Sequence, residues 1–189
     1  MTVTNTDNLI KNMTDQMKEA QIKLGYAKET IRLYYPLGSL MAILGIDNNK
    51  ITGKITIEEM QHILQESKEL QSTGLGKLIF NVHGGRLEIS VPPEGAEYVN
   101  NEADDPAFLT EIIAFFGAHH HCSIEDVKKI FERYSKEYVC EKTKEDMDFD
   151  YVLYFKDSSI DPYYYCIKEE MGHTIYHRFS REDYLALIS

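Results

Sequence analysis

The two halves of this 189-residue chain repeat the same order of helix and turn signals. An apolar run that ends in glycine occupies 40–45 and has a counterpart at 112–117, and a helix start at Thr56 has a counterpart at Ser123. Both starts resemble capping boxes, in which a Ser or Thr precedes an acidic residue by three positions. A pattern typical of β-strands follows in each half. Helix, turn, capped helix and hairpin is the plan of a winged helix.

We therefore expect an α+β fold of tandem winged-helix-like units, each a helix-turn-helix plus a β-hairpin. The alternative is a single mixed α+β domain, since capped amphipathic helices resemble one another by coincidence. The predicted first unit, 1–100, holds the N-terminal helices and a winged-helix-like unit. The predicted second unit, 101–189, is winged-helix-like with a C-terminal β-meander and helix. The polar stretch 94–106, in which Asp104-Asp105-Pro106 breaks the chain before the next helix, is the expected boundary between the units.

Apolar residues at spacings of three and four predict an amphipathic helix between Asp7 and Gly25. We expect this helix to pack on its own domain, with a homodimer through this helix as the alternative. A short helix is expected over 27–33 and another over 36–44, because a proline disfavours helical backbone in the residue before it. The stripe of the first helix consists of Ile10, Met13, Met17, Ala20 and Leu24.

Strand patterns occupy one hairpin in the first half and a meander in the second. The segments 77–82 and 86–91 flank His83-Gly84-Gly85, which is a good hairpin turn. In the second half we expect strands at 149–155, 163–169 and 173–179, a charged loop at 141–148, and a final helix that ends at Ile188.

Charge and composition exclude several classes of protein. The net charge is −11, and no apolar run reaches the roughly 18 residues that a membrane span needs. The first residues lack the basic and apolar parts of a signal peptide. The capped segment 56–70 carries four carboxylates and one lysine, which disfavours contact with DNA phosphates. The three cysteines lack metal-site spacing and favour a reduced, cytoplasmic chain.

The common catalytic motifs are absent from the sequence. There is no GxSxG, no P-loop and no HExxH, and Gly74-Leu75-Gly76 does not continue into a dinucleotide fingerprint. Three histidines at 119–121 precede Cys122, but neighbours in one loop diverge, so we expect a solvated turn there. His173 and His177 share a strand face about 13 Å apart, too far for one metal ion. We predict no catalytic residue, no metal and no cofactor.

Tyrosine is concentrated in the second half, where nine of the thirteen lie after residue 133. Alternation along a strand sends Tyr163 and Tyr165 to one face and Tyr164 to the other. By the same rule only one of His177 and Arg178 faces the core. We favour a buried Arg178 paired with a nearby carboxylate, for which Asp161 and Glu169 are the candidates, over an exposed recognition patch.

Several stretches resemble a bacterial family labelled only as a domain of unknown function, over nearly the whole chain. They are 21–26, 29–37, 95–99, 161–166 and 175–179. The resemblance implies no activity. All seven of our candidate residues lie inside these stretches; the resemblance marks six of them, and the tyrosine pattern adds Tyr164. The ligand- or partner-binding candidates are Arg32, Tyr34, Tyr35, Tyr98, Tyr164, His177 and Arg178.

The function that we predict is a cytoplasmic, non-enzymatic protein-interaction or regulatory module with a protein partner. The alternative is a small-ligand-binding protein or an enzyme that uses the Tyr/His/Arg-rich C-terminal sheet. A second alternative is a DNA-binding regulator, which the net charge of −11 disfavours.

Overall fold

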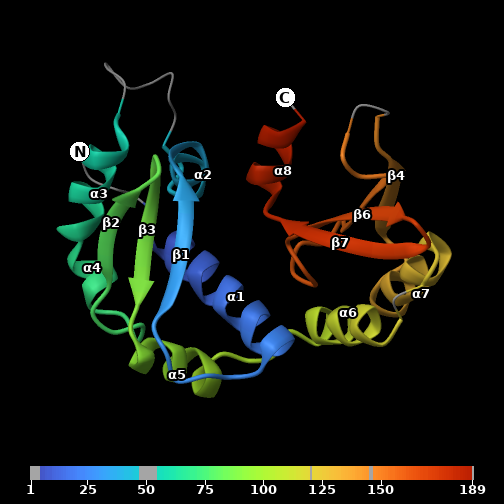
Figure 1. Ribbon diagram of the computed structural model, residues 1–189, viewed down its shortest axis with the longest axis horizontal. Helices are drawn as coiled ribbons and strands as arrows, with labels where there is room; N and C mark the ends of the chain where they lie inside the picture. Colours follow the sequence, from blue (N-terminus) through green and yellow to red (C-terminus); the bar gives the residue numbers. More distant parts are fainter. Residues whose placement is uncertain (1–4, 47–54, 120, 145–146, 189) are drawn as a thin grey trace. The chain divides into compact units, whose positions relative to one another are not determined.

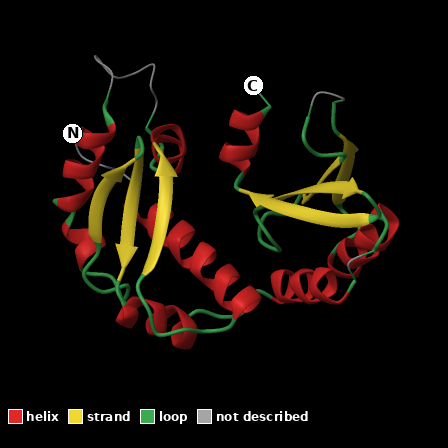
Figure 2. Ribbon diagram, viewed as in Figure 1, coloured by secondary structure: helices red, strands yellow, loops and turns green. Residues whose placement is uncertain are grey.

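The computed structural model describes residues 5–46, 55–119, 121–144 and 147–188. Its fold is mixed α+β, with eight helices and two antiparallel sheets among these residues (Figure 1, Figure 2). The chain divides into two compact units, Met1–Asp104 and Asp105–Ser189, and each has its own sheet.

The first unit places a three-stranded sheet, sheet A, among five helices. The strand order is β1-β3-β2, so β3 lies in the centre and β1 joins the hairpin of β2 and β3. Figure 1 shows α3 beside β2 at one edge of this sheet. The elements are α1 (Thr6–Leu24), β1 (Ile31–Pro36), α2 (Leu37–Ile43), α3 (Ile57–Gln65), α4 (Lys68–Gln71), β2 (Ile79–His83), β3 (Arg86–Val91) and α5 (Pro93–Glu102).

The core of the first unit lies between α1 and one face of sheet A. Met13 and Met17 are fully buried, as predicted, but Leu9 takes the place expected for Ile10, and Leu24 is 87% exposed. The middle of the helix therefore packs on its own unit, whereas its C-terminal end at Leu24 is exposed. The homodimer through this helix stays a prediction. The sheet contributes Leu33, Tyr35, Phe80, Leu87 and Ile89 to the same core.

The expected helix over 27–33 is wrong, because residues 31–36 form β1. Their alternating burial matches a strand with one face on a core, and all six residues pair with β3, from Ile31 opposite Val91 to Pro36 opposite Arg86. The residues of β3 that pair with β1 lie about fifty or more positions further along the chain, so local periodicity does not reveal this pairing. The helix expected over 36–44 is present as α2, with Pro36 as its N-cap residue.

The polar stretch 94–106, the expected boundary, contains the helix α5 over most of its length, and the two units divide just after this helix, between Asp104 and Asp105. Pro93 lies in its first turn, where a proline is well tolerated, and Gly95, Ala96 and Val99 form its buried face. A Cβ atom at Gly95 would lie 2.3 Å from the carbonyl oxygen of Leu75. Glycine at this position therefore allows α5 to approach the loop after α4.

The second unit packs two helices on one face of a four-stranded meander, sheet B, with order β4-β5-β6-β7. The charged loop predicted at 141–148 is wrong at its first two residues, because 141–142 belong to the strand β4. It pairs along its whole length with β5. The elements are α6 (Ala107–Ala118), α7 (Ile124–Tyr134), β4 (Tyr138–Lys142), β5 (Tyr151–Phe155), β6 (Tyr164–Glu170), β7 (His173–Phe179) and α8 (Arg181–Leu187).

An aromatic cluster forms the core of the second unit. The ring of Phe108 on α6 makes edge-on contacts with Phe131, Phe155 and Tyr165, at centroid distances of 4.7 to 5.4 Å. Edge-to-face pairs of this kind add to the free energy of burial. Tyr164 points to the opposite face, where its ring stacks on Tyr184 of α8. Sheet B is therefore covered by α6 and α7 on one side and partly by α8 on the other.

Both predicted capping boxes are present. Thr56 accepts a hydrogen bond from the backbone of Glu59, and Ser123 accepts one from the backbone of Asp126; each acidic side chain accepts a bond from the backbone of the cap residue in return. The sheets that follow differ, since one has three strands in the order β1-β3-β2 and the other is a four-stranded meander.

We expect Gly95→Ala to lower the free energy of unfolding by about 1–3 kcal/mol, because the new methyl group overlaps backbone atoms. Gly38→Ala is the matched control. Gly38 lies in the helix α2, and a Cβ atom there would have nothing within 4 Å, so alanine should stabilise by about 0.5–1 kcal/mol. Urea denaturation of both full-length variants measures the difference. Equal midpoints for both variants would contradict the close approach of α5.

Candidate functional site

The outer face of sheet A is the first candidate site. Alternation directs three residues of each strand away from the core, and the register aligns them in three rows across the strands. Two of the predicted residues, Arg32 and Tyr34, lie on this face. We define the outer face as Arg32, Tyr34, Pro36, Ile79, Asn81, His83, Arg86, Glu88 and Ser90.

Polar contacts hold the middle of this face in place. Tyr34 on β1 lies opposite Glu88 on β3, and their side chains are hydrogen-bonded. This bond raises the pKa of the Tyr34 phenol and lowers the pKa of the Glu88 carboxyl group. Arg32 lies 4.0 Å from Glu88, and Ser90 donates to the same carboxylate over 3.2 Å. The Tyr34 ring stays 45% exposed.

The other two predicted residues of the first unit are engaged in packing. Tyr35 is buried, and its hydroxyl group donates to Asn12 over 2.9 Å and accepts from Gln16 over 3.2 Å, which ties β1 to α1. Tyr98 lies on α5 with its ring against Gly74, where a Cβ atom would be 2.3 Å from the ring. The sequence groups Tyr35 and Tyr98 with Arg32 and Tyr34 as binding candidates. In the fold Tyr35 and Tyr98 make packing contacts within the first unit, whereas Arg32 and Tyr34 lie on the outer face of sheet A.

Arg178 is buried and paired with Asp161, which is the arrangement that we favoured from the sequence. Its side chain is 4% exposed and that of Asp161 is 2% exposed, with 3.4 Å between Nη2 and Oδ2. The guanidinium carbon lies 3.5 Å from the centre of the Tyr163 ring. Asp161 also accepts hydrogen bonds from the Tyr163 backbone and the Tyr165 hydroxyl group. This cluster holds the 161–165 segment against β7.

His177 and Tyr164 lie on the opposite face of sheet B from Arg178. The Tyr164 ring stacks between Tyr154 and Tyr184, at centroid distances of 4.2 and 4.9 Å. His177 is exposed, with its ring 5.4 Å from that of Phe149. The structure therefore does not bring Arg178 together with these two predicted residues.

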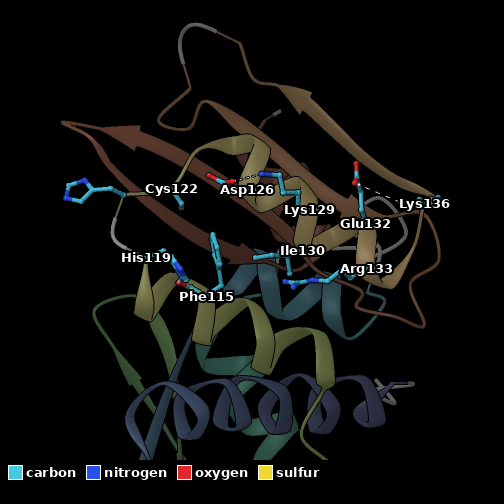
Figure 3. Close-up of a pocket in the computed structure, with 10 residues that line it drawn as sticks. Phe115, His119, Cys122, Asp126, Lys129, Ile130, Glu132, Arg133 and Lys136 are labelled. Atoms are coloured by element: carbon cyan, nitrogen blue, oxygen red, sulfur yellow. Dashed lines mark hydrogen bonds and ion pairs between the residues drawn. The ribbon is translucent and has the colours of Figure 1, made fainter.

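The second candidate site is a pocket between α6 and α7, with a volume of about 600 Å³. Figure 3 shows Ile130 and Arg133 extending from α7 towards α6, where Phe115 and His119 lie. None of the seven predicted residues lines it. The lining residues are Phe115, His119, His121, Cys122, Asp126, Lys129, Ile130, Glu132, Arg133 and Lys136. The sequence holds no signal for this pocket, because its two sides come together only when α6 packs against α7.

The 119–122 loop beside this pocket is attached to the turn between β6 and β7. His121 is hydrogen-bonded to the Gly172 carbonyl group, and its ring centroid lies 4.6 Å from that of His173. Thr174 donates to the carbonyl oxygen of Cys122. Within the described ranges, no three His, Cys, Asp or Glu side chains are grouped to hold a metal ion, and His120 lies outside those ranges.

Burial raises the pKa of all three cysteine thiols above the ordinary value, to about 12 for Cys166. A neutral thiol is a poor nucleophile, since the thiolate is the reactive form. Across the part of the chain that the structure describes, no helix has the length and apolar character to cross a membrane.

We expect Arg178→Ala to lower the free energy of unfolding by about 3–5 kcal/mol at neutral pH, because it leaves the buried Asp161 carboxylate without its cation. Arg178→Lys should also destabilise, since an ammonium group cannot reproduce the planar stacking on Tyr163. Arg86→Ala, at an exposed arginine, is the control and should melt close to the wild type. Thermal melting measures all three.

The deficit of Arg178→Ala should depend on pH. Burial raises the pKa of Asp161 and Arg178 opposes that rise, so removal of Arg178 raises the pKa further. A carboxyl group with a raised pKa in the folded state costs stability as the pH rises through that pKa. The deficit should therefore be full at pH 7 and shrink towards pH 4. A deficit that is constant over this range would argue against the ion pair as its cause.

Comparison with known proteins agrees with the resemblance found in the sequence. Residues 6–188 match the family described as "Domain of unknown function, E. rectale Gene description (DUF3877)". No curated protein and no solved structure matches the chain. The match spans most of both units, and the family carries no assigned function. The chain therefore belongs to the DUF3877 family, a domain of unknown function.

Proposed function

We propose that this chain is a non-enzymatic protein-interaction module whose first unit contacts an acidic segment of a partner protein through the outer face of sheet A. The observation that carries the proposal is the arrangement of Arg32, Tyr34 and Arg86 on that exposed face. Tyr and Arg are the residue types that most often carry binding energy at protein interfaces.

The net positive charge of the outer face favours a partner segment with negative charge. Arg32 and Arg86 are both exposed, His83 lies beside Arg86, and Glu88 already contacts Tyr34 and Arg32. The face is therefore net positive on a chain with a net charge of −11. Complementary charge increases the association rate and excludes basic partners. An acidic segment is the chemistry that this surface fits best.

The two edge strands of the face provide apolar contact area. Tyr34 is 45% exposed and Ile79, two strands away, is 55% exposed. The hydrogen bond to Glu88 restricts the Tyr34 side chain before any partner binds. A restricted side chain loses less conformational entropy on binding, which favours affinity.

We also propose that the first unit has a winged-helix plan. Its support is the order α1, β1, α2, α3, α4, β2, β3, in which α4 is a short helix between α3 and the hairpin, together with the strand order β1-β3-β2. For the second unit the support is the helix pair α6 and α7, with the capping box at the start of α7. The second unit departs from the plan in its sheet, which is a four-stranded meander instead of a hairpin wing. The proposed location is the cytoplasm, since the three free cysteines suit a reducing compartment.

The winged-helix plan does not favour DNA as the partner. In a helix-turn-helix protein the second helix lies in the major groove among phosphates. The equivalent helix here is α3, which exposes Glu58, Glu59 and, at its C-cap, Glu66. Carboxylates at these positions repel the phosphates that supply most of the affinity.

Site-specific photo-crosslinking in the native host tests the protein partner. A p-benzoyl-phenylalanine residue replaces Tyr34, and the same residue at Tyr98, a comparably exposed tyrosine of the same unit, is the matched control. We expect an adduct from position 34 and none from position 98, with an acidic peptide at the crosslink. Combined Arg32→Glu and Arg86→Glu substitutions should reduce the adduct about tenfold.

The conservative pair Arg32→Lys and Arg86→Lys should retain most of the adduct. Equal adducts at positions 34 and 98, or a crosslinked peptide without acidic residues, would contradict the proposal.

A second measurement addresses DNA. In about 50 mM salt, where phosphate contacts are strongest, a labelled random duplex should stay unbound at micromolar concentrations of the full-length chain. A mobility shift that disappears as salt is raised would instead support the DNA-binding alternative.

A further inference from the structure

We infer that the pocket between α6 and α7 binds a small aromatic molecule that carries a phosphate or carboxylate group. The pocket belongs to the second unit alone and shares no residue with the outer face of sheet A. Its volume of about 600 Å³ lies within the range that small-molecule sites occupy.

The pocket walls on α6 and α7 provide an apolar and aromatic surface. Ile130 is 1% exposed and forms part of the wall on α7. The ring of His119, at the C-cap of α6, stacks on Phe115, with centroids 4.7 Å apart and an angle of 21°. Nδ1 of His119 is also hydrogen-bonded to the Phe115 carbonyl oxygen at 3.0 Å, which orients the ring. Aromatic pairs of this kind favour a further ring in offset stacking.

The rim of the pocket carries three cationic side chains, each paired with a carboxylate. Lys129 and Arg133 are four residues apart on α7, so they share a face of the helix, and Lys136 follows shortly after the helix ends. Figure 3 shows these three side chains from α7 and the segment after it, together with Asp126 and Glu132. The lining has three cationic side chains and two carboxylates, whereas the whole chain has a net charge of −11.

The ion pairs at the rim do not prevent an anion from binding. Lys129 lies 2.8 Å from Asp126, Lys136 lies 4.0 Å from Glu132, and Arg133 is paired with Glu111. The side chains of Lys129 and Lys136 are 71% and 82% exposed, and exposed pairs contribute little to stability. A phosphate offers stronger, charge-assisted hydrogen bonds, and Arg133 has a planar group suited to them.

Phenyl phosphate is the probe that tests the inference. It is titrated into the isotope-labelled full-length chain and followed by amide NMR shifts. We expect saturable shifts confined to 115–136. Two comparison probes separate the parts of the ligand: inorganic phosphate has the charge without the ring, and phenol has the ring without the charge. Each should bind at least about tenfold more weakly than phenyl phosphate.

Variants on α7 locate the site. Lys129→Gln and Arg133→Gln should each weaken phenyl phosphate about five- to tenfold. Lys128→Gln is the matched control, because it removes the same charge from the same helix at a residue that pairs with Glu125 outside the pocket lining. These side chains are surface-exposed in part, so the dispersed NMR spectrum of each variant should persist.

Two results would overturn the inference. One is equal affinity for phenyl phosphate and inorganic phosphate, and the other is an equal loss of affinity in Lys128→Gln and Lys129→Gln. Neither result bears on the proposed partner surface, because that surface lies in the first unit.

Discussion

The pairing of Arg178 with Asp161 determines which side chains of the second unit face solvent. A guanidinium group enters a protein interior only with a partner, and here the partner belongs to the segment that leads into β6. Because neighbouring strand residues point to opposite faces, the burial of Arg178 directs His177 outwards. The same alternation buries Tyr165 and directs Tyr164 to the face on which α8 packs.

The two proposed sites share one electrostatic property. Each gathers cationic side chains on an acidic chain: Arg32 and Arg86 on the outer face of sheet A, and Lys129, Arg133 and Lys136 at the α6–α7 pocket. Over distances longer than about 10 Å the surrounding charge is screened by salt, so the nearby cations dominate what binds there. A polyanion such as nucleic acid is long enough to meet the acidic residues around these sites directly, and those residues repel it. This combination suits short acidic segments and small anions better than nucleic acid.

Part of the fold and of the sites could be predicted from local patterns. The capping boxes at Thr56 and Ser123 and the hairpin around Gly84 depend on a few adjacent residues, and all three are present. The burial of Arg178 could also be anticipated locally. Alternation allows only one of His177 and Arg178 to face the core, and a buried arginine needs a carboxylate, which Asp161 supplies. The pocket could not be predicted, because its wall on α6 and its rim on α7 meet only after the two helices pack.

The sequence by itself determined the capped helix starts at Thr56 and Ser123, the alternation along the hairpin strands and the acidic surface of α3, since each depends on residues close together in the chain. Tertiary structure alone decided that 31–36 is a strand, that the polar stretch 94–106 contains α5, and that Tyr35 and Tyr34 have different roles. β1 exists because β3 supplies its hydrogen bonds from a distant part of the chain. α5 depends on the close approach of Gly95 to Leu75, a contact between separate segments that no local periodicity records.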